Sequence, residues 1–410
     1  MTSPAFAPVD EQLARLGRGA VDLVERPQLA DKLARSRKSG QPLLIKTGFD
    51  PSSPDLHLGH TVLLRKMRHF QELGHRVVFL VGSFTALIGD PTGKKTTRPQ
   101  LTEEEVQANA RTYQEQVYKV LDREKTEIDF NGRWLVPLGA VGIVRLAGRY
   151  TLARIMERED FRTRFAEGQP IHLHELLYPL AQGYDSVAMK ADVELGGHDQ
   201  IFNLLVGRDL MREEGLEPQV CLTVPLLVGL DGQQKMSKSL GNAIALEESA
   251  REMYGKTMSI PDTLMWDWYL LLTDLDEAEI KARRAAVEAG TLHPKGVKQE
   301  LARRIVADYH GEAAAREAEA EFERVFTGGG TPDDVPEVRV DASAPLYKVI
   351  VSAGLAASNN EARRLVVQGA VSLDGETVSG EDAPTRTLAP RGDAYLLKVG
   401  KRRFARVRAS

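Results

Sequence analysis

The sequence predicts an α/β fold over residues 1–245, a helical region over residues 246–326 and a small α+β unit over residues 343–410. In the first part, short apolar runs alternate with stretches of helical length, which is typical of βαβ units around a parallel sheet. Helical periodicity dominates the second part. Residues 327–342 are rich in Gly, Pro and Asp, so we predict a linker there.

The first elements follow from apolar runs and their spacing. Residues 1–35 are expected to be mainly helical, because their leucines and valines recur with loose helical periodicity. Residues 42–45 are expected to form a buried strand and residues 76–81 a second one. A helix over residues 58–73 should lie between them, after a glycine-containing turn.

Two later segments carry clearer end signals. Residues 103–121 are expected to form a helix, with Thr102 as its N-cap and three glutamates at its positive end. Residues 220–230 return to strand character and end at Asp231-Gly232, a dipeptide typical of a turn.

The C-terminal unit has its own start and stop signals. Ser358–Glu361 has the pattern of a capping box that opens a helix, and Gly369 is placed to close that helix. Residues 371–378 predict two short strands joined by a turn at Asp374-Gly375.

Composition narrows the class of protein. Hydrophobic residues make up 42% and charged residues 27% of the chain, a balance typical of a folded globular protein. The single cysteine, Cys221, excludes an internal disulfide framework and a cysteine-based zinc site. The N-terminus lacks the pattern of a signal peptide, and no apolar run is long enough to cross a membrane. We therefore expect a cytoplasmic protein without a membrane partner.

The charge is unevenly placed. The net charge is −4, but residues 343–410 carry 11 Lys and Arg against 6 Asp and Glu. A basic unit attached to an acidic body suggests a polyanionic partner that docks on one part of the surface. A solvated charged tail would explain the charge count equally well.

The first candidate site is Asp55–His60 (DLHLGH), at the start of the helix predicted over residues 58–73. A helix N-terminus favours an anion, because its free N–H groups and its dipole both point there. His57 and His60 could flank a phosphate, and Gly59 leaves room for a base or ribose. The alternatives are incidental histidines, or a metal pair for which no third ligand is evident.

The second candidate site is Lys235–Ser239 (KMSKS), after a predicted strand and turn. Lys235 and Lys238 suit a mobile clamp that neutralises a triphosphate as pyrophosphate leaves. Taken alone, such a pattern is more often a solvated basic loop.

Together the two segments resemble the paired HIGH and KMSKS motifs of class I aminoacyl-tRNA synthetases. Residues 89–95 do not form a P-loop, because three residues instead of four separate the glycines and Lys95 replaces the Ser or Thr. Four segments, in family order, resemble the tyrosyl-tRNA synthetases in particular: Lys46–Pro51, Gly89–Lys94, Tyr178–Asp185 and Gly196–Gln200.

The resemblance implies a domain for each part of the chain. Residues 1–245 would form a Rossmann-like catalytic domain with an N-terminal helix and a dimer-forming insertion. Residues 246–326 would form an α-helical anticodon-region domain, and residues 327–342 a linker. Residues 343–410 would form an S4-like RNA-binding domain, because three segments resemble that domain: 354–356, 361–366 and 369–375.

The resemblance also implies a homodimer that activates L-tyrosine with ATP, releases pyrophosphate and transfers tyrosine to the 3′ end of tyrosine tRNA. ATP would be a substrate accompanied by Mg²⁺, with no bound organic cofactor, no zinc and no protein-held metal. Two alternatives stay open: another class I synthetase of tryptophanyl type, and a synthetase-like RNA-binding protein without catalysis.

Spacing and resemblance agree on the tyrosine pocket. Tyr178, Gln182 and Asp185 are four and three residues apart on a predicted helix and so lie on one face. The resemblance places Asp185 on the phenol hydroxyl, and Tyr178, Gln182 and Asp90 on the ammonium group. An amphipathic helix with its polar residues in water is the alternative. The full set implied for tyrosine is Gly48, Asp90, Tyr178, Gln182, Asp185 and Gln200.

The resemblance further assigns groups to ATP and RNA. Ser52, His57 and His60 would act at the α-phosphate, and Asp50 and Gly59 would complete the ATP site. The cations expected on pyrophosphate are Lys94, Arg98, Lys235 and Lys238. Those expected on RNA phosphates are Arg363, Arg364, Lys401, Arg402 and Arg403.

One residue departs from the commoner family pattern. Many tyrosyl-tRNA synthetases carry a second phenol-binding tyrosine two residues before Gly48, and here that residue is Lys46. A lysine at this position could donate to a phenol or pair with Asp185.

Overall fold

The computed structural model describes residues 6–92, 101–326, 335–380, 382–391, 393–400 and 403–409. The chain divides into two compact units, Met1–Arg316 and Glu317–Ser410. Among the described residues, no helix is long and apolar enough to cross a membrane.

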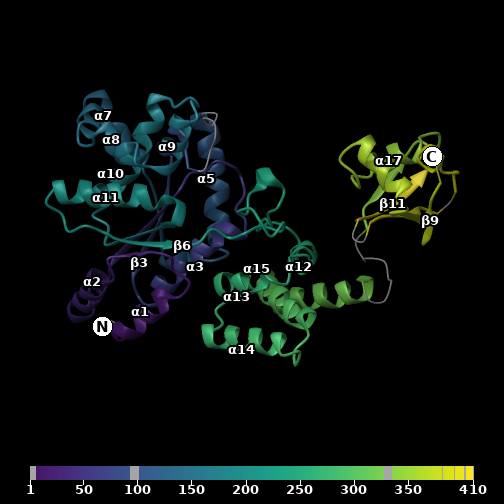
Figure 1. Cartoon of the computed structure of the whole chain (residues 1–410), viewed down its shortest axis with the longest axis horizontal. Coiled ribbons are helices and arrows are strands. Elements are labelled where there is room, and N and C mark those ends of the chain that lie inside the picture. The colour runs from purple at the N-terminus through teal and green to yellow at the C-terminus, as the bar shows by residue number, and fades with distance from the viewer. Residues whose placement is uncertain are drawn as a thin grey trace. The chain divides into compact units, whose positions relative to one another are not determined.

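The first unit is built around a six-stranded sheet (Figure 1). The strand order is β1-β6-β5-β2-β3-β4, and every neighbouring pair is parallel except β1 and β6. The chain runs outward from β2 through β3 to β4 on one side, and from β5 to β6 on the other. The order therefore reverses between β2 and β5, which is a Rossmann-like switch point where ligands bind at the carboxyl ends of strands. The strands are β1 (Leu23–Val24), β2 (Leu44–Phe49), β3 (Arg76–Val81), β4 (Thr126–Phe130), β5 (Val193–Gly197) and β6 (Val220–Val224).

Helices cover both faces of this sheet, so its inner strands are buried on both sides. In Figure 1, α10 (Tyr178–Met189) and α11 (Ile201–Glu213) lie on one side of the strands and α3 (Leu58–Glu72) lies on the other. All five residues of β6 are buried, and so are all residues of β3 except Arg76. The α/β prediction is confirmed.

Three predictions in this unit needed correction. Residues 9–39 form α1 (Val9–Gly17) and α2 (Arg26–Ser39), but β1 interrupts them, because Leu23 and Val24 pair with β6. The capping box at Thr102 is confirmed, yet α5 (Glu103–Val117) ends earlier than residue 121, in a turn that buries Val120 and Leu121. β6 stops at Val224 because Pro225, the next residue, has no N–H to donate.

The segment after β4 consists of short helices. These are α6 (Gly132–Leu135), α7 (Gly139–Ala147), α8 (Leu152–Ile155) and α9 (Glu159–Ala166). A similar short helix, α4 (Thr85–Ile88), follows β3.

The helical prediction for residues 246–326 is confirmed. The elements are α12 (Ala250–Met258), α13 (Met265–Leu272), α14 (Glu277–Glu288) and α15 (Pro294–Phe326). Gly311, at φ 85° and ψ 161°, interrupts α15 five residues before the boundary between the two units.

The second unit contains a five-stranded sheet in the order β7-β11-β10-β8-β9. The hairpin prediction is confirmed, because Asp374 and Gly375 both have positive φ, as the turn between β8 and β9 requires. Ser358 caps α17 as expected, although the Glu361 carboxylate accepts from the N–H of Ala357 instead of Ser358. The elements are β7 (Glu337–Val340), α16 (Leu346–Ser352), α17 (Asn359–Val367), β8 (Val371–Leu373), β9 (Glu376–Val378), β10 (Tyr395–Val399) and β11 (Arg403–Ala409).

Part of the predicted linker is a strand. Residues 337–340 form β7, which pairs in parallel with β11. The local composition predicted a linker because it does not include the partner strand, which lies about 70 residues later in the sequence. Pairing with that strand is what makes this segment a strand. Residues 327–334 of the linker lie outside the described residues.

Candidate active site

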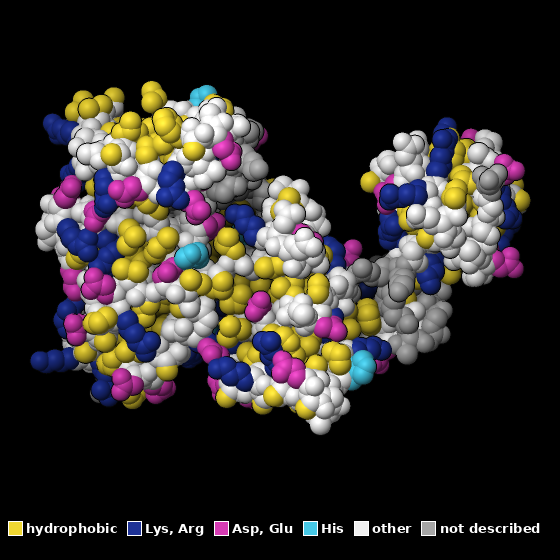
Figure 2. Space-filling model, in the orientation of Figure 1, with side chains coloured by type: hydrophobic (Ala, Val, Ile, Leu, Met, Phe, Trp, Pro, Cys, Tyr) yellow, Lys and Arg dark blue, Asp and Glu magenta, His cyan; other side chains and the backbone are white. Residues whose placement is uncertain are grey.

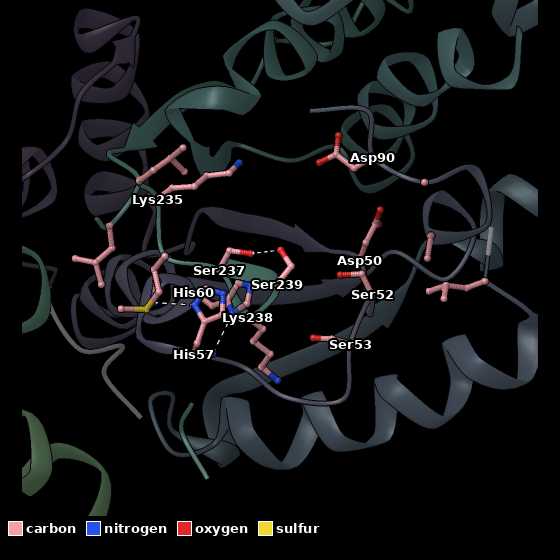
Figure 3. Close-up of a pocket in the computed structure, with 17 residues that line it drawn as sticks. Asp50, Ser52, Ser53, His57, His60, Asp90, Lys235, Ser237, Lys238 and Ser239 are labelled. Carbon is pink, nitrogen blue, oxygen red and sulfur yellow. Dashed lines mark hydrogen bonds between the residues drawn. The ribbon is translucent and has the colours of Figure 1, made fainter. Parts of the chain in front are cut away.

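Two adjoining cavities open at the carboxyl ends of β2 and β5. Figure 3 shows the first, where His57 and His60 lie beside the KMSKS segment and Asp90 lies across the opening. The second cavity shares Asp50, Gly59, His60, Asp90 and Lys235 with the first and extends to α10. Every described residue predicted for tyrosine or ATP lines one or both: Gly48, Asp50, Ser52, His57, Gly59, His60, Asp90, Tyr178, Gln182, Asp185, Gln200, Lys235 and Lys238. Lys94 and Arg98 lie outside the described residues.

The two histidines begin α3 and cap it. The Nδ1 atom of His57 accepts a hydrogen bond from the N–H of Gly59, and Nδ1 of His60 accepts one from the N–H of His57, both at 3.1 Å. The rings stack with their centroids 3.8 Å apart. Burial, together with the charge of Lys238, lowers the pKa of His57 to about 4 and that of His60 well below its usual value. Both rings are therefore neutral at pH 7, and each carries its proton on Nε2 as a hydrogen-bond donor.

Gly59 is required by close packing between the two motifs. A Cβ atom at this position would lie 2.9 Å from the His57 ring and 3.5 Å from Cβ of Met236. Met236, in the middle of the KMSKS segment, is itself buried. The glycine therefore lets the second motif pack directly on the first.

Backbone hydrogen bonds also join the two motifs. The N–H of Leu58 donates to the carbonyl of Ile244, and the N–H of Leu246 donates to the carbonyl of Leu56, both at 3.0 Å. His57 and Ala245 form an antiparallel bridge between these bonds. The segment after KMSKS is thus tied to the segment that carries the histidines.

Each lysine of the KMSKS segment is paired with a carboxylate at the cavity rim. Nζ of Lys238 lies 2.7 Å from Oδ2 of Asp55, and Nζ of Lys235 lies 3.4 Å from Oδ2 of Asp199. Both lysines remain partly exposed, so an entering polyphosphate can take over these contacts. The carboxylates hold the two cations in place before the substrate arrives.

A hydrogen-bonded ring surrounds Asp90. Nε2 of Gln200 donates to Oδ2 of Asp90 at 3.0 Å and to Oγ1 of Thr92 at 2.9 Å. Nδ2 of Asn203 donates to the side-chain oxygens of Gln182 and Gln200, both at 2.8 Å. The carboxylate and amide groups are therefore oriented before any ligand binds.

Two further side chains support this wall of the cavity. Arg158 is buried, and its Nη2 atom lies 3.5 Å from Oδ1 of Asp90 and donates to Oγ1 of Thr92. The Tyr178 hydroxyl donates to Oδ2 of Asp50 at 2.9 Å. Burial and the nearby carboxylate charges raise the pKa of Tyr178, which keeps the hydroxyl protonated as a donor.

The closed end of the second cavity is formed by Asp185. Its Oδ1 accepts from Nε1 of Trp134 at 2.8 Å, and its Oδ2 accepts from Nδ2 of Asn131 at 3.3 Å. Burial raises the pKa of Asp185 to about 7, against the opposing charge of Lys46. Each oxygen accepts one N–H group and keeps a second lone pair, so the carboxylate can accept a further donor.

Lys46 forms its ion pair with Glu194 and not with Asp185, which was one of two partners that the sequence left open. Nζ of Lys46 lies 2.8 Å from Oε1 of Glu194, and both side chains are 1% exposed. Lys46 acts on Asp185 through its charge, and it is not among the residues that line the cavity.

Several supporting residues were missed from the sequence. Asn203 could have been found, because it follows Gln200 by three residues at the start of α11 and so shares its face. Thr92 and Asp199 lie inside the family segments Gly89–Lys94 and Gly196–Gln200, which could have marked them. Nothing in the local sequence marks Asn131, Trp134 or Arg158, which reach Asp185 and Thr92 from loops and a short helix.

The basic residues predicted to bind RNA lie in the second unit. Arg363 and Arg364 are exposed on α17, and the guanidinium of Arg363 lies 4.1 Å from the centre of the Tyr347 ring. Arg403 donates to the carbonyl of Leu355 and lies 3.4 Å from a carboxylate oxygen of Glu361, so it also ties β11 to α17. Lys401 and Arg402 lie outside the described residues.

Solved structures with a similar fold are tyrosyl-tRNA synthetases. The enzyme from Archaeoglobus fulgidus, crystallised with L-tyrosine, has a TM-score of 0.62 at 23% identity and covers 76% of this chain and 100% of its own. A truncated mitochondrial enzyme from Aspergillus nidulans has a TM-score of 0.63 at 22% identity and covers 78% of this chain and 94% of its own. At these identities the similarity establishes the fold.

Sequence comparison establishes the family. Residues 38–327 match the family described as tRNA synthetases class I (W and Y), and residues 329–407 match the SYY-like C-terminal domain of tyrosine–tRNA ligases. The tyrosine–tRNA ligase of Desulfotalea psychrophila is 54% identical over 401 residues, which are 97% of this chain and 98% of the relative. That of Geobacter sulfurreducens is 54% identical over 402 residues, 97% and 99% of the two chains. This chain therefore belongs to the class I tRNA synthetases of the tryptophan and tyrosine group and, within it, to the tyrosine–tRNA ligases.

Proposed function

We propose that the two cavities carry out the tyrosine–tRNA ligase reaction, in which L-tyrosine is activated with ATP and then transferred to the 3′ end of tyrosine tRNA. One observation carries this proposal. The second cavity, which is lined by the buried Asp185, shares lining residues with the first cavity, which holds two histidine donors and two lysines. Tyrosine in the second cavity would present its carboxylate to the α-phosphate of ATP in the first.

The tyrosine subsite would recognise both ends of the amino acid. Asp185 would accept the phenol hydroxyl, while Tyr178, Gln182 and Asp90 would hold the ammonium group. Gln200, which already donates to Asp90, would turn toward the substrate carboxylate or the adenylate. Phenylalanine would bind weakly, because it brings no donor for the remaining acceptor position of Asp185.

The first step would be attack of the tyrosine carboxylate oxygen on the α-phosphorus, with cleavage of the bond to pyrophosphate. The nucleophile is already anionic, so catalysis would come from positioning and charge stabilisation. His57, His60 and Ser52 would donate to the α-phosphate oxygens. The pyrophosphate would be met by cations from both sides: Lys94, Arg98, Lys235 and Lys238.

ATP would enter as its Mg²⁺ complex, with the ion held by phosphate oxygens. The carboxylates nearest the lysines support this view, because Asp55 and Asp199 are already paired with Lys238 and Lys235. Gly59 and Asp50 would complete the nucleotide subsite. In the second step, the terminal hydroxyl of the tRNA would attack the tyrosyl carbonyl and displace AMP.

A homodimer is supported by exposed apolar side chains around α7 and α8. Figure 2 shows apolar side chains gathered on the end of the first unit that carries these helices. Exposed apolar patches are typical of protein interfaces. The most exposed large apolar side chains in this part of the chain are Val136, Val141, Val144, Leu152, Phe165 and Leu173.

The remaining parts of the chain would serve tRNA. Residues 246–326 would approach the anticodon, and residues 343–410, after the linker at 327–342, would bind the tRNA backbone. The basic side chains proposed for this contact are Arg363, Arg364, Lys401, Arg402 and Arg403. Residues 1–245 would form the catalytic domain, and the enzyme would work in the cytoplasm.

Pyrophosphate exchange into ATP, measured with each amino acid separately, tests the proposal. We expect exchange with tyrosine and none with tryptophan or phenylalanine. Exchange driven by another amino acid would contradict the substrate assignment. A chain that binds tyrosine tRNA without any exchange would instead be a non-catalytic RNA-binding protein.

A further inference from the structure

A buried ion pair lies beneath the floor of the tyrosine cavity. Lys46 of β2 and Glu194 of β5 are register partners, and their side chains are 1% exposed and 2.8 Å apart. Two residues further along the same strands, Gly48 and Gly196 line the cavity. Side chains two residues apart on a strand share a face and are about 7 Å apart. The pair therefore lies below the residues that line the cavity, one side-chain position further from the strand ends.

Three side chains donate hydrogen bonds to the Glu194 carboxylate. Its Oε1 accepts from Lys46, and its Oε2 accepts from Oγ of Ser186 and Nε2 of Gln219, all at 2.8 Å. Ser186 follows Asp185 on α10, so the pair contacts the same helical turn that carries the phenol acceptor. Two desolvated charges seldom add net stability, so a fully buried pair of this kind suggests a role beyond holding the fold together.

Both members of this pair act on Asp185 through their charge, in addition to the larger effect of burial. The Lys46 ammonium lowers the pKa of Asp185, and the Glu194 carboxylate raises it. The neutral donors Trp134 and Asn131 contact Asp185 from α6 and the residue before that helix. The other carboxylates that line this cavity are Asp90, Asp199 and Asp50, the last of which accepts from Tyr178.

We propose that Lys46 and Glu194 are a positioning pair for phenol recognition. Their opposite charges act on Asp185 through space and together determine how readily its carboxylate accepts the substrate hydroxyl. This inference rests on the proposed function. Neither side chain touches the substrate, so neither is catalytic. Lys46 would thus take part in phenol recognition from beneath the cavity, without a direct hydrogen bond to the ligand.

Two isosteric substitutions with opposite electrostatic effects test the inference. Lys46→Met removes the cation, and Glu194→Gln removes the anion while keeping a hydrogen-bonding side chain. The tyrosine KM and kcat would be measured by pyrophosphate exchange between pH 5.5 and 8.5, together with inhibition by L-phenylalanine, which lacks the hydroxyl.

We expect the pH midpoint of tyrosine KM to rise in Lys46→Met and to fall in Glu194→Gln. At a pH below the midpoint, KM should change about tenfold for every pH unit by which the midpoint moves. The kcat and the inhibition by phenylalanine should change less than twofold in both variants. The double variant, which leaves no unpaired buried charge, should return the midpoint close to that of the wild type.

Equal weakening of tyrosine and phenylalanine, with an unmoved midpoint, would overturn the inference and leave the pair a purely structural role. If Lys46→Met does not fold, Glu194→Gln alone tests the inference. A pH midpoint of tyrosine KM that rises or stays unchanged in Glu194→Gln would then overturn it. Absence of tyrosine-dependent exchange in the wild type would refute the proposed function itself.

Discussion

The ammonium group of Lys238 lies 2.7 Å from the carboxylate of Asp55, which precedes His57 by two residues. A cation of the KMSKS segment is therefore held by an anion from the segment that carries the histidines. We expect the phosphates of ATP to replace Asp55 as the partner of this lysine. The pair is a resting contact, and the two residues should respond to substitution in different ways.

Lys238→Ala should slow adenylate formation while leaving tyrosine affinity nearly unchanged. The lost cation stabilises charge that develops on pyrophosphate, and loss of one such group costs about 10²–10³-fold in rate. Asp55→Asn is the matched control, because it removes the resting partner and keeps the lysine. Its rate should stay near that of the wild type. Single-turnover kinetics with saturating tyrosine would measure both, and a normal burst in Lys238→Ala would contradict the assigned role.

The two functions of His57 can be separated by substitution. His57→Ala removes both the N-cap of α3 and the Nε2 donor, whereas His57→Asn keeps a side chain that caps well. We expect a loss of about 1 kcal/mol in the free energy of unfolding for His57→Ala only. Adenylate formation should slow in both variants. Equal stability loss in the two variants would show that capping is not the structural role of His57.

The pKa of about 7 for Asp185 predicts a pH-dependent tyrosine KM. Below this value the carboxyl group is protonated and accepts the phenol hydroxyl more weakly than the carboxylate does, so KM should rise as pH falls from 8 to 6. Above it the group is ionised, and KM should level off. Exchange assays over this range measure the effect. Asp185→Asn, which does not titrate, should show a high KM without this midpoint, and a midpoint that persists in the variant would assign it to another group.

Gly59→Ala should displace the His57 ring, because the new Cβ would lie 2.9 Å from it. Overpacking of this kind costs roughly 1–3 kcal/mol, and adenylate formation should slow with it. Gly296→Ala on α15 is the control, because no atom lies within 4 Å of a Cβ there. That variant should gain roughly 0.5–1 kcal/mol and keep full activity. Thermal unfolding and exchange assays distinguish the two.

Removal of residues 327–410, which hold the sheet of the second unit, should separate activation from charging. The cut should follow Phe326, because a chain that kept residues 337–340 would retain β7 without β11. The shortened chain should still make tyrosyl-adenylate but charge tRNA poorly, and its tRNA affinity should depend less steeply on salt. Arg363→Ala with Arg364→Ala in the full chain should weaken tRNA binding without affecting exchange. Normal charging by the shortened chain would show that this unit is not the tRNA anchor.

Elements governed by neighbouring residues could be predicted from the sequence. The Thr102 cap, the Asp374-Gly375 turn and the strand over residues 76–81 all form where expected. The pairing of β1 with β6 and of β7 with β11 could not be predicted. Those strands depend on hydrogen bonds to distant segments, which leave no local pattern.

The sequence by itself determined which side chains would meet in the cleft, because the motif residues and their order along a Rossmann-like fold place them at the same strand ends. Only the tertiary structure decided their charge states and partners. The histidines are neutral, Lys46 pairs with Glu194, and Arg158 supports Asp90. The physical reason is that burial and charge coupling depend on residues brought together from distant parts of the chain, so they arise only once the fold has formed.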